Sequence, residues 1–158
     1  MREQKKRGLC RMINIQVPDN EFKVDLRTED YGQLLDKRQG IYMIYNEDGI
    51  LMYAGKSKDV RNRVKMHMNS ANSNPLKGYN HNFHYVVGFY EESYFDLSLY
   101  EIYIINTLKP KLNYDNVYTY ETERYIDKWK SATTIRQEHE EELELQRKMD
   151  NSIIDFKL

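Results

Sequence analysis

The sequence contains little cysteine, little proline and no long apolar run. Its single cysteine, Cys10, excludes an internal disulfide and any zinc or iron–sulfur site built from several cysteines. No apolar stretch approaches the ~20 residues that a membrane-spanning helix needs. The basic N-terminus is followed by neither an apolar stretch nor a cleavage site, so it does not resemble a secretory signal. Together, these absences predict a cytoplasmic protein with no membrane partner.

The charge is balanced overall but unevenly distributed. The net charge is −1, yet residues 55–84 contain six lysines and arginines against one aspartate, a local charge of +5. The first eleven residues carry five cations against one glutamate, a local charge of +4, whereas residues 138–144 are almost wholly acidic. This distribution fits an anionic partner bound at one place, although charge runs are more often only the solvated side of an element.

Length and composition predict one globular domain with extensions. A chain of 158 residues that is 40% hydrophobic is long enough to bury one core. We expect an N-terminal extension, a compact domain and a C-terminal extension, over residues 1–39, 40–116 and 117–158.

The compact domain has the clearest local pattern. Two apolar and aromatic runs of strand length flank a turn in which Gly49 can adopt a positive φ, which is typical of a hairpin. The order β-β-α-β-α then predicts an α+β fold, a three-stranded antiparallel sheet flanked by helices. Its expected elements are strands over 40–45 and 50–54, a helix capped by Ser57 and ending near Asn69, a strand over 83–90, and a helix that Asp96 or Ser98 opens and Pro110 ends.

The two extensions have weaker patterns. The alternating residues 11–17 predict a strand ended by Pro18, and residues 28–37 predict a short helix. Residues 120–149 predict a helical extension, which could pack on the domain or pair with a second copy as a homodimer.

A carboxylate interrupts the apolar side of the last helix expected in the domain. On a helical wheel, Glu101 lies about 40° from Leu97 and within the apolar face. Burying a carboxylate is costly unless something pairs with it. Glu101 is therefore either a residue that reaches past the rim or pairs with an internal cation, or an acid/base group or metal ligand.

Two further pairs of residues are weak indicators of function when each pair is considered alone. Arg63 and His67, four residues apart, share one edge of the apolar stripe of the first expected helix. They could point into a groove shared with the hairpin, or simply reach solvent and bond to the backbone. Tyr42 and Tyr53 lie one on each hairpin strand, but with 14 tyrosines in the chain their positions alone indicate little.

In their order and spacing along the chain, these residues resemble the signature of the GIY-YIG nuclease superfamily. Gly40-Ile41-Tyr42 is followed after ten residues by Tyr53-Ala54-Gly55, with alanine in place of the second isoleucine. The resemblance extends over residues 40–116. Its further matches are Lys56 directly after the glycine, Arg63 eight residues after Gly55, His67 four beyond that, Glu101 at the metal-binding glutamate and Asn113 at the asparagine that ends the domain.

The resemblance implies a divalent-metal-dependent endonuclease that hydrolyses DNA phosphodiester bonds. Glu101 would bind one Mg²⁺ or Mn²⁺ ion per active site, and Arg63 would neutralise charge on the pentacovalent phosphate. Tyr42 would activate the attacking water as general base. An ordinary tyrosine has a pKa of about 10, so a cation is needed to favour the phenolate, and Lys56 is the candidate.

The remaining family positions imply supporting roles. Tyr53 and His67 would hydrogen-bond the phosphate or the water, and Asn113 would hold the geometry. Which of the two tyrosines is the general base stays open. The family includes restriction, phage and mobile-element endonucleases, and the short extensions favour a small stand-alone enzyme of that kind.

The basic stretch supplies candidate contacts to DNA, with RNA as an alternative partner. These contacts would set affinity without reading sequence, although any of them could be an ordinary surface cation. They are Lys58, Arg61, Lys65 and Lys77. A function of another class also remains, a catalytically idle nucleic-acid-binding or assembly module that works through the C-terminal helix.

Overall fold

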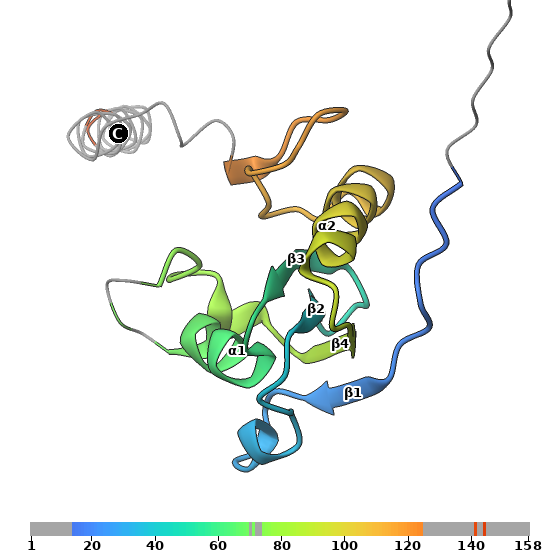
Figure 1. The fold of residues 1–158 in the computed structure, drawn as a ribbon. Helices are drawn as coiled ribbons and strands as arrows, with labels where there is room; N and C mark the ends of the chain where they lie inside the picture. Colours follow the sequence, from blue (N-terminus) through green and yellow to red (C-terminus); the bar gives the residue numbers. More distant parts are fainter. Residues whose placement is uncertain (1–13, 70, 72–73, 125–140, 142–143, 145–158) are drawn as a thin grey trace, which may run out of the picture.

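The computed structural model describes residues 14–69, 71, 74–124, 141 and 144, and Figure 1 shows their arrangement. Within these residues the chain forms an α+β fold of four strands and two helices, with two short 3₁₀ turns. The elements in chain order are β1 (Phe22–Asp25), η1 (Tyr31–Gln33), β2 (Gly40–Tyr45), β3 (Leu51–Ser57), α1 (Val60–Met68), η2 (Asn80–Asn82), β4 (Tyr85–Tyr90) and α2 (Tyr94–Leu108).

The sheet is antiparallel with the strand order β1-β4-β2-β3. The predicted hairpin and third strand are confirmed, but the expected number of strands was one too few. The additional strand, β1, pairs Phe22 with Gly88 and Asp25 with Tyr85. It has four residues, of which only Val24 is buried, so its alternation was too short to be recognised.

Both elements predicted before the domain differ from the structure. Residues 14–17 of the expected strand have no regular structure, and residues 11–13 lie outside the described part. The helix expected over residues 28–37 is reduced to η1. In that segment only Leu35 is buried while Leu34 is exposed, and one apolar anchor does not stabilise an isolated helix.

The two helices lie on opposite faces of the sheet (Figure 1). Alternate side chains of β2 explain this arrangement, because Tyr42 and Ile44 point toward α1 whereas Ile41 and Met43 point toward α2. The buried anchors of α1 are Val60 and Val64, and those of α2 are Leu97, Ile104 and Ile105. Strand β3 forms one edge of the sheet, within reach of both helices.

Helix boundaries follow side-chain caps that the sequence offered at several positions. Helix α1 begins at Val60, three residues after the predicted cap, because Asp59 accepts the Asn62 amide at 2.9 Å. Helix α2 begins at Tyr94, before the predicted starts at Asp96 or Ser98, because Ser93 accepts the Asp96 amide. It ends before Pro110 as predicted, with Lys109 in the left-handed region at φ 54°.

Most of the helix predicted over residues 120–149 lies outside the described residues, so the proposed extension boundaries stay predictions. Within the described part, no helix is both long and apolar enough to cross a membrane.

Candidate functional site

The candidate site begins where the two signature segments meet on neighbouring strands. Tyr42 of β2 lies directly opposite Gly55 of β3. A Cβ atom at position 55 would lie 2.7 Å from the Tyr42 hydroxyl oxygen and 3.0 Å from its Cζ. Glycine therefore leaves the space that the phenol occupies, which explains physically why the second segment ends in glycine.

Helix α1 places a histidine against this phenol. The Tyr42 hydroxyl lies 2.9 Å from His67 Nε2, and both side chains are 1% exposed. The ring of Tyr53 completes the cluster, with its centroid 6.2 Å from that of Tyr42 and 5.1 Å from that of His67. The other imidazole nitrogen, Nδ1, is buried and has no hydrogen-bond partner among the described residues.

Burial governs the protonation of this cluster. It raises the pKa of Tyr42 well above its ordinary value, and the neighbouring Tyr53 raises it further, whereas the Arg63 guanidinium lowers it. Burial, followed by the Glu101 charge, also raises the pKa of Tyr53. Burial and then Arg63 lower the pKa of His67 to about 4. At neutral pH the imidazole is therefore uncharged and able to accept a proton at one nitrogen.

Glu101 reaches the same region from α2. Its Oε1 accepts the backbone N–H of Lys56 at 3.0 Å, and its Oε2 pairs with the Lys56 ammonium at 3.1 Å. The ammonium also donates to Ser98 Oγ at 3.0 Å. Lys56 was expected to lower the pKa of Tyr42, but its charge lies against Glu101, and Arg63 is the cation that lowers that pKa.

Asn113 holds the edge of the sheet beside these residues. Its side-chain Oδ1 accepts the Ala54 N–H at 2.9 Å, and its Nδ2 donates to the Ala54 carbonyl at 2.8 Å. The side chain thus satisfies both backbone groups that an edge strand leaves unpaired at this position. This is the contact that a geometry-holding residue would make.

Two nearby residues were missed by the sequence analysis. Asn116 Nδ2 donates to Glu101 Oε2 at 3.2 Å, and its own carbonyl accepts from Asn106 Nδ2 at 2.8 Å. Asn116 has φ 60°, a conformation that asparagine tolerates better than most residues. Arg124 lowers the pKa of both Tyr53 and His67. Asn116 belongs to no periodic pattern, and Arg124 lies in the predicted helical extension, where nothing in the sequence relates it to the site.

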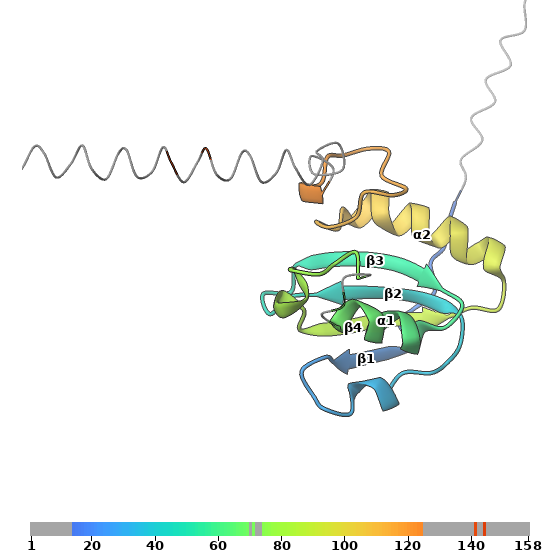
Figure 2. The ribbon, with the colours of Figure 1, turned by 90° about the vertical axis from the view of Figure 1, so that its left-hand side faces the viewer.

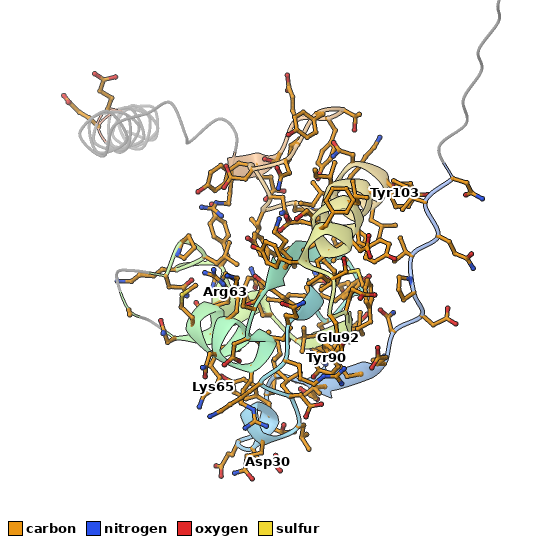
Figure 3. All side chains as sticks on the ribbon, in the orientation of Figure 1. Asp30, Arg63, Lys65, Tyr90, Glu92 and Tyr103 are labelled. Carbon is orange, nitrogen blue, oxygen red and sulfur yellow. The ribbon has the colours of Figure 1, made fainter. Side chains whose placement is uncertain are left out.

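The basic residues that were predicted to contact phosphate lie in different places in the structure. Figure 3 shows Arg63 and Lys65 on opposite sides of α1, with Lys65 on the side of Asp30. The exposed Arg63 guanidinium donates one hydrogen bond, to the Met66 sulfur at 3.8 Å. Its other N–H donors have no hydrogen-bond partner among the described residues. Arg61 shares the side of Lys65, and its Nε donates to the Leu35 carbonyl.

The other two basic residues also lie apart from each other. Lys58 lies with its Nζ 5.5 Å from the ring centroid of Tyr94, at the start of α2 and beside Lys56. Lys77 is exposed in the segment between α1 and η2. Of the four predicted basic contacts, only Lys58 is thus brought next to the residues around Glu101.

The donor set fits one hard cation with few protein ligands. The described residues contain no group of three or more histidine, cysteine, aspartate or glutamate side chains that could enclose a metal ion. Glu101 offers a carboxylate whose Oε1 accepts one described hydrogen bond, which leaves a lone pair for a cation. Mg²⁺ and Mn²⁺ accept such single-carboxylate sites when water and phosphate oxygens complete the coordination.

Comparisons with known proteins identify the family to which the sequence is similar. The family model described as the GIY-YIG catalytic domain matches residues 38–115. An uncharacterised Bacillus subtilis protein, YurQ, is 32% identical over 89 residues, covering 56% of this chain and 71% of YurQ. The UvrABC system protein C of Maricaulis maris is 28% identical over 91 residues, covering 53% of this chain but only 13% of that protein.

A solved structure also matches about half of the chain. It is the N-terminal GIY-YIG endonuclease domain of UvrC from Thermotoga maritima, a point mutant bound to its catalytic divalent cation. The match has a TM-score of 0.46 and 19% identity, and covers 52% of this chain and 90% of that domain.

Proposed function

Because this chain belongs to the GIY-YIG family, with residues 38–115 matching its catalytic domain, we propose that it is a divalent-metal-dependent endonuclease that hydrolyses DNA phosphodiester bonds. The observation that carries the proposal is the convergence of three groups on one phenol. Tyr42 is hydrogen-bonded to His67 and is influenced by the charges of both Arg63 and Glu101. These groups come from α1 and α2, on opposite faces of the sheet, and meet around the β3 edge.

The Tyr42–His67 pair supports proton removal from an attacking water. A protonated phenol cannot accept a second proton, and burial raises the pKa of Tyr42. The hydroxyl can, however, donate its own proton to His67 Nε2 at 2.9 Å while its oxygen takes the proton from water. The resulting imidazolium would be opposed by burial, and a negatively charged phosphate nearby would offset that cost.

The charged residues support stabilisation of the transition state. The exposed guanidinium of Arg63 can form two hydrogen bonds to phosphate oxygens and neutralise the charge that develops on them. A divalent ion bound at Glu101 would supply Lewis-acid stabilisation of the leaving oxygen. Within the protein, Lys56 and Asn116 hold the Glu101 carboxylate in place, and Asn113 fixes the strand from which Lys56 extends.

Binding of the DNA backbone is proposed to centre on Lys58 and Arg63. Both are exposed cations next to the site, and phosphate contacts of this type set affinity without reading sequence. Arg61 and Lys65 lie on the other side of α1 and, on this proposal, contribute less.

The direct test is cleavage of supercoiled plasmid and of RNA by the purified chain with Mg²⁺, Mn²⁺ or EDTA. We expect nicked or linear DNA with either metal and none with EDTA. The Tyr42→Phe variant removes one oxygen atom and should lose cleavage by about 10²-fold or more, which also separates this activity from a contaminating nuclease. A folded wild-type chain that binds DNA with a strong salt dependence but cuts neither substrate would instead identify the idle binding module.

A further inference from the structure

Helix α2 carries a second apolar side that the fold does not use. Its sheet-facing side buries Leu97, Ile104 and Ile105. The opposite side carries Phe95, Leu99, Ile102 and Tyr103, which are 37–72% exposed. The first three of these and Asn106 are spaced by four, three and four residues, the spacing at which helices pair through one seam. We call the four apolar residues the α2 seam.

Asp96, in the first turn of α2, is the one charged side chain that borders the α2 seam, and it lies at the edge of the stripe rather than within it. Among its 15 residues the helix has only two ionisable acids and no cation, namely Asp96 and Glu101. Glu101 is engaged with Lys56 and lies well over 90° around the helix from the middle of the seam. Within the described part of the chain, no other labelled helix or strand lies on this side of α2 (Figure 2), although the segment that follows α2 passes over its C-terminal end and bonds to Asn106.

The exposed apolar area lies in the upper part of the range, about 300–600 Å², that the largest apolar patch of a monomer usually covers. Tyr118 extends the α2 seam, because its amide bonds to Asn106 Oδ1 at 2.7 Å and its ring is 72% exposed. With aromatic side chains of 150–250 Å² each, the α2 seam and Tyr118 expose on the order of 500 Å². Patches of that size are often functional, whereas single exposed apolar residues need no explanation.

We propose that the α2 seam binds the same seam of a second copy, forming a two-fold symmetric dimer. An uncharged stripe needs an uncharged partner, since burying an unpaired charge is costly. The other described helix, α1, exposes Arg63 and Lys65 and cannot serve without burying cations. The seam of a second copy has matching spacing and no charge, and an isologous contact uses one surface twice.

The area predicts how tightly the copies associate. Two copies of the α2 seam together with Tyr118 would bury about 1,000 Å² in total if all of their exposed area were covered, which is the lower limit for a specific interface. The dimer should therefore form reversibly at micromolar concentrations rather than permanently. Aromatic residues such as Phe95 and Tyr103 are the type that dominates binding at such contacts.

The arrangement has a consequence for catalysis, which rests on the proposed nuclease function. Because Glu101 faces away from the α2 seam, pairing leaves both candidate sites open. One particle would then hold two sites related by two-fold symmetry, which would make it easier for a chain with one site to cut both strands of a duplex. The dimer itself depends on neither metal nor nucleic acid.

The test is the oligomeric state of the full chain, measured by sedimentation equilibrium from about 1 to 200 µM in the absence of nucleic acid and metal. We expect a monomer–dimer equilibrium between the 19.1 kDa chain mass and twice that value. Ile102→Glu should weaken the dimer at least 10-fold, because it places like charges across the axis. Leu34→Glu, at a side chain 56% exposed beside η1, should leave the equilibrium unchanged.

A second variant guards against misfolding. Phe95→Glu changes a side chain that is 72% exposed in the first turn of α2, where an acidic residue favours the helix, and it should also weaken the dimer. A wild-type chain that stays monomeric to 200 µM would overturn the proposal, and would leave the seam to another segment of the same chain. Dimers that persist in the folded Ile102→Glu and Phe95→Glu variants would overturn it equally, because the contact would then lie elsewhere. Since no nuclease assay is involved, neither outcome depends on catalysis.

Discussion

Helices α1 and α2 differ in charge and in the face of the sheet that they cover, but their candidate functional residues lie in the same region. Helix α1 has three cations in nine residues and no acid, whereas α2 has two acids in fifteen residues and no cation. They pack on opposite faces of the sheet (Figure 1). Each nevertheless directs one charged residue, Arg63 from α1 and Glu101 from α2, to the region of the β3 edge.

The comparison also distinguishes residues within each helix. On α1, Arg63 lies on the side of the site and Lys65 on the side of Asp30 (Figure 3). On α2, Glu101 is engaged by Lys56 and Asn116, whereas Asp96 lies in the first turn. Position on the helix, rather than charge, should therefore decide the effect of substitution.

The largest contrast is expected on α1. Arg63→Ala should lower the single-turnover cleavage rate by 10²- to 10³-fold, since it removes a donor aimed at developing charge. Lys65→Ala removes an equal charge two residues away and should change the rate less than about threefold. Equal losses in both variants would mean that α1 acts only through its general positive charge.

Buried and exposed histidines should respond differently to acid. His67 has its pKa lowered to about 4 from 6.5 by burial, so between these values the unfolded chain binds a proton that the folded chain does not. Stability is then fully present above about pH 6.5 and is lost as the pH falls toward 4, by at most about 3 kcal/mol.

The measurement is urea unfolding of matched variants at pH 7, 5 and 4. His67→Gln should have a shallower loss of unfolding free energy than the wild type over this range, whereas His81→Gln, at an exposed site, should follow the wild type. Identical slopes in all three proteins would show that His67 is protonated in the folded state or titrates normally.

A smaller effect is expected where a side chain orients Glu101. Asn116→Gly keeps the positive φ of 60° accessible but removes the amide that donates to Glu101. Partners of metal ligands commonly contribute 10-fold or more to affinity, so Mn²⁺ binding measured by electron paramagnetic resonance should weaken about 10-fold. Unchanged Mn²⁺ affinity in this variant would limit Asn116 to holding its loop.

The smallest effect concerns the DNA backbone. Lys58→Ala, measured by fluorescence anisotropy in EDTA, should weaken DNA binding severalfold and reduce the salt slope by about one unit. Lys23→Ala, on β1 where the ammonium lies over the Tyr85 ring, serves as the matched control and should leave both values unchanged. A larger effect in the control would place the DNA on the other edge of the sheet.

The sequence predicted those parts of the fold that depend on local chemistry. The hairpin around Gly49, the third strand and the end of α2 before Pro110 were confirmed because turn residues and apolar runs specify them. Strand β1 was missed because it is held by its register with β4 rather than by its own pattern. Competing caps at Ser57 and Asp59 explain the misplaced start of α1.

The sequence predicted which residues belong to the candidate site better than it predicted the contacts between them. The helical wheel placed Glu101 in the apolar face, and the structure shows why it is tolerated there, since Lys56 pairs with it. Pairing with an internal cation was one of the predicted alternatives, but Lys56 was not identified as the partner because it had been assigned to Tyr42. The Tyr42–His67 contact joins residues 25 positions apart, and only the packing of α1 on β2 creates it.

Glu101 offers the most direct test of the proposed site, because it is the residue through which α2 would contribute to the same site as α1. The decisive measurement is the single-turnover rate of plasmid cleavage across a Mg²⁺ or Mn²⁺ titration for wild type, Glu101→Gln and Asp96→Asn. We predict that the Glu101→Gln protein, folded and still binding DNA, loses at least about 10³-fold in cleavage rate. The cleavage rate of the control, Asp96→Asn, should stay within about threefold of the wild-type rate. Wild-type cleavage by a folded Glu101→Gln protein would contradict the proposed site.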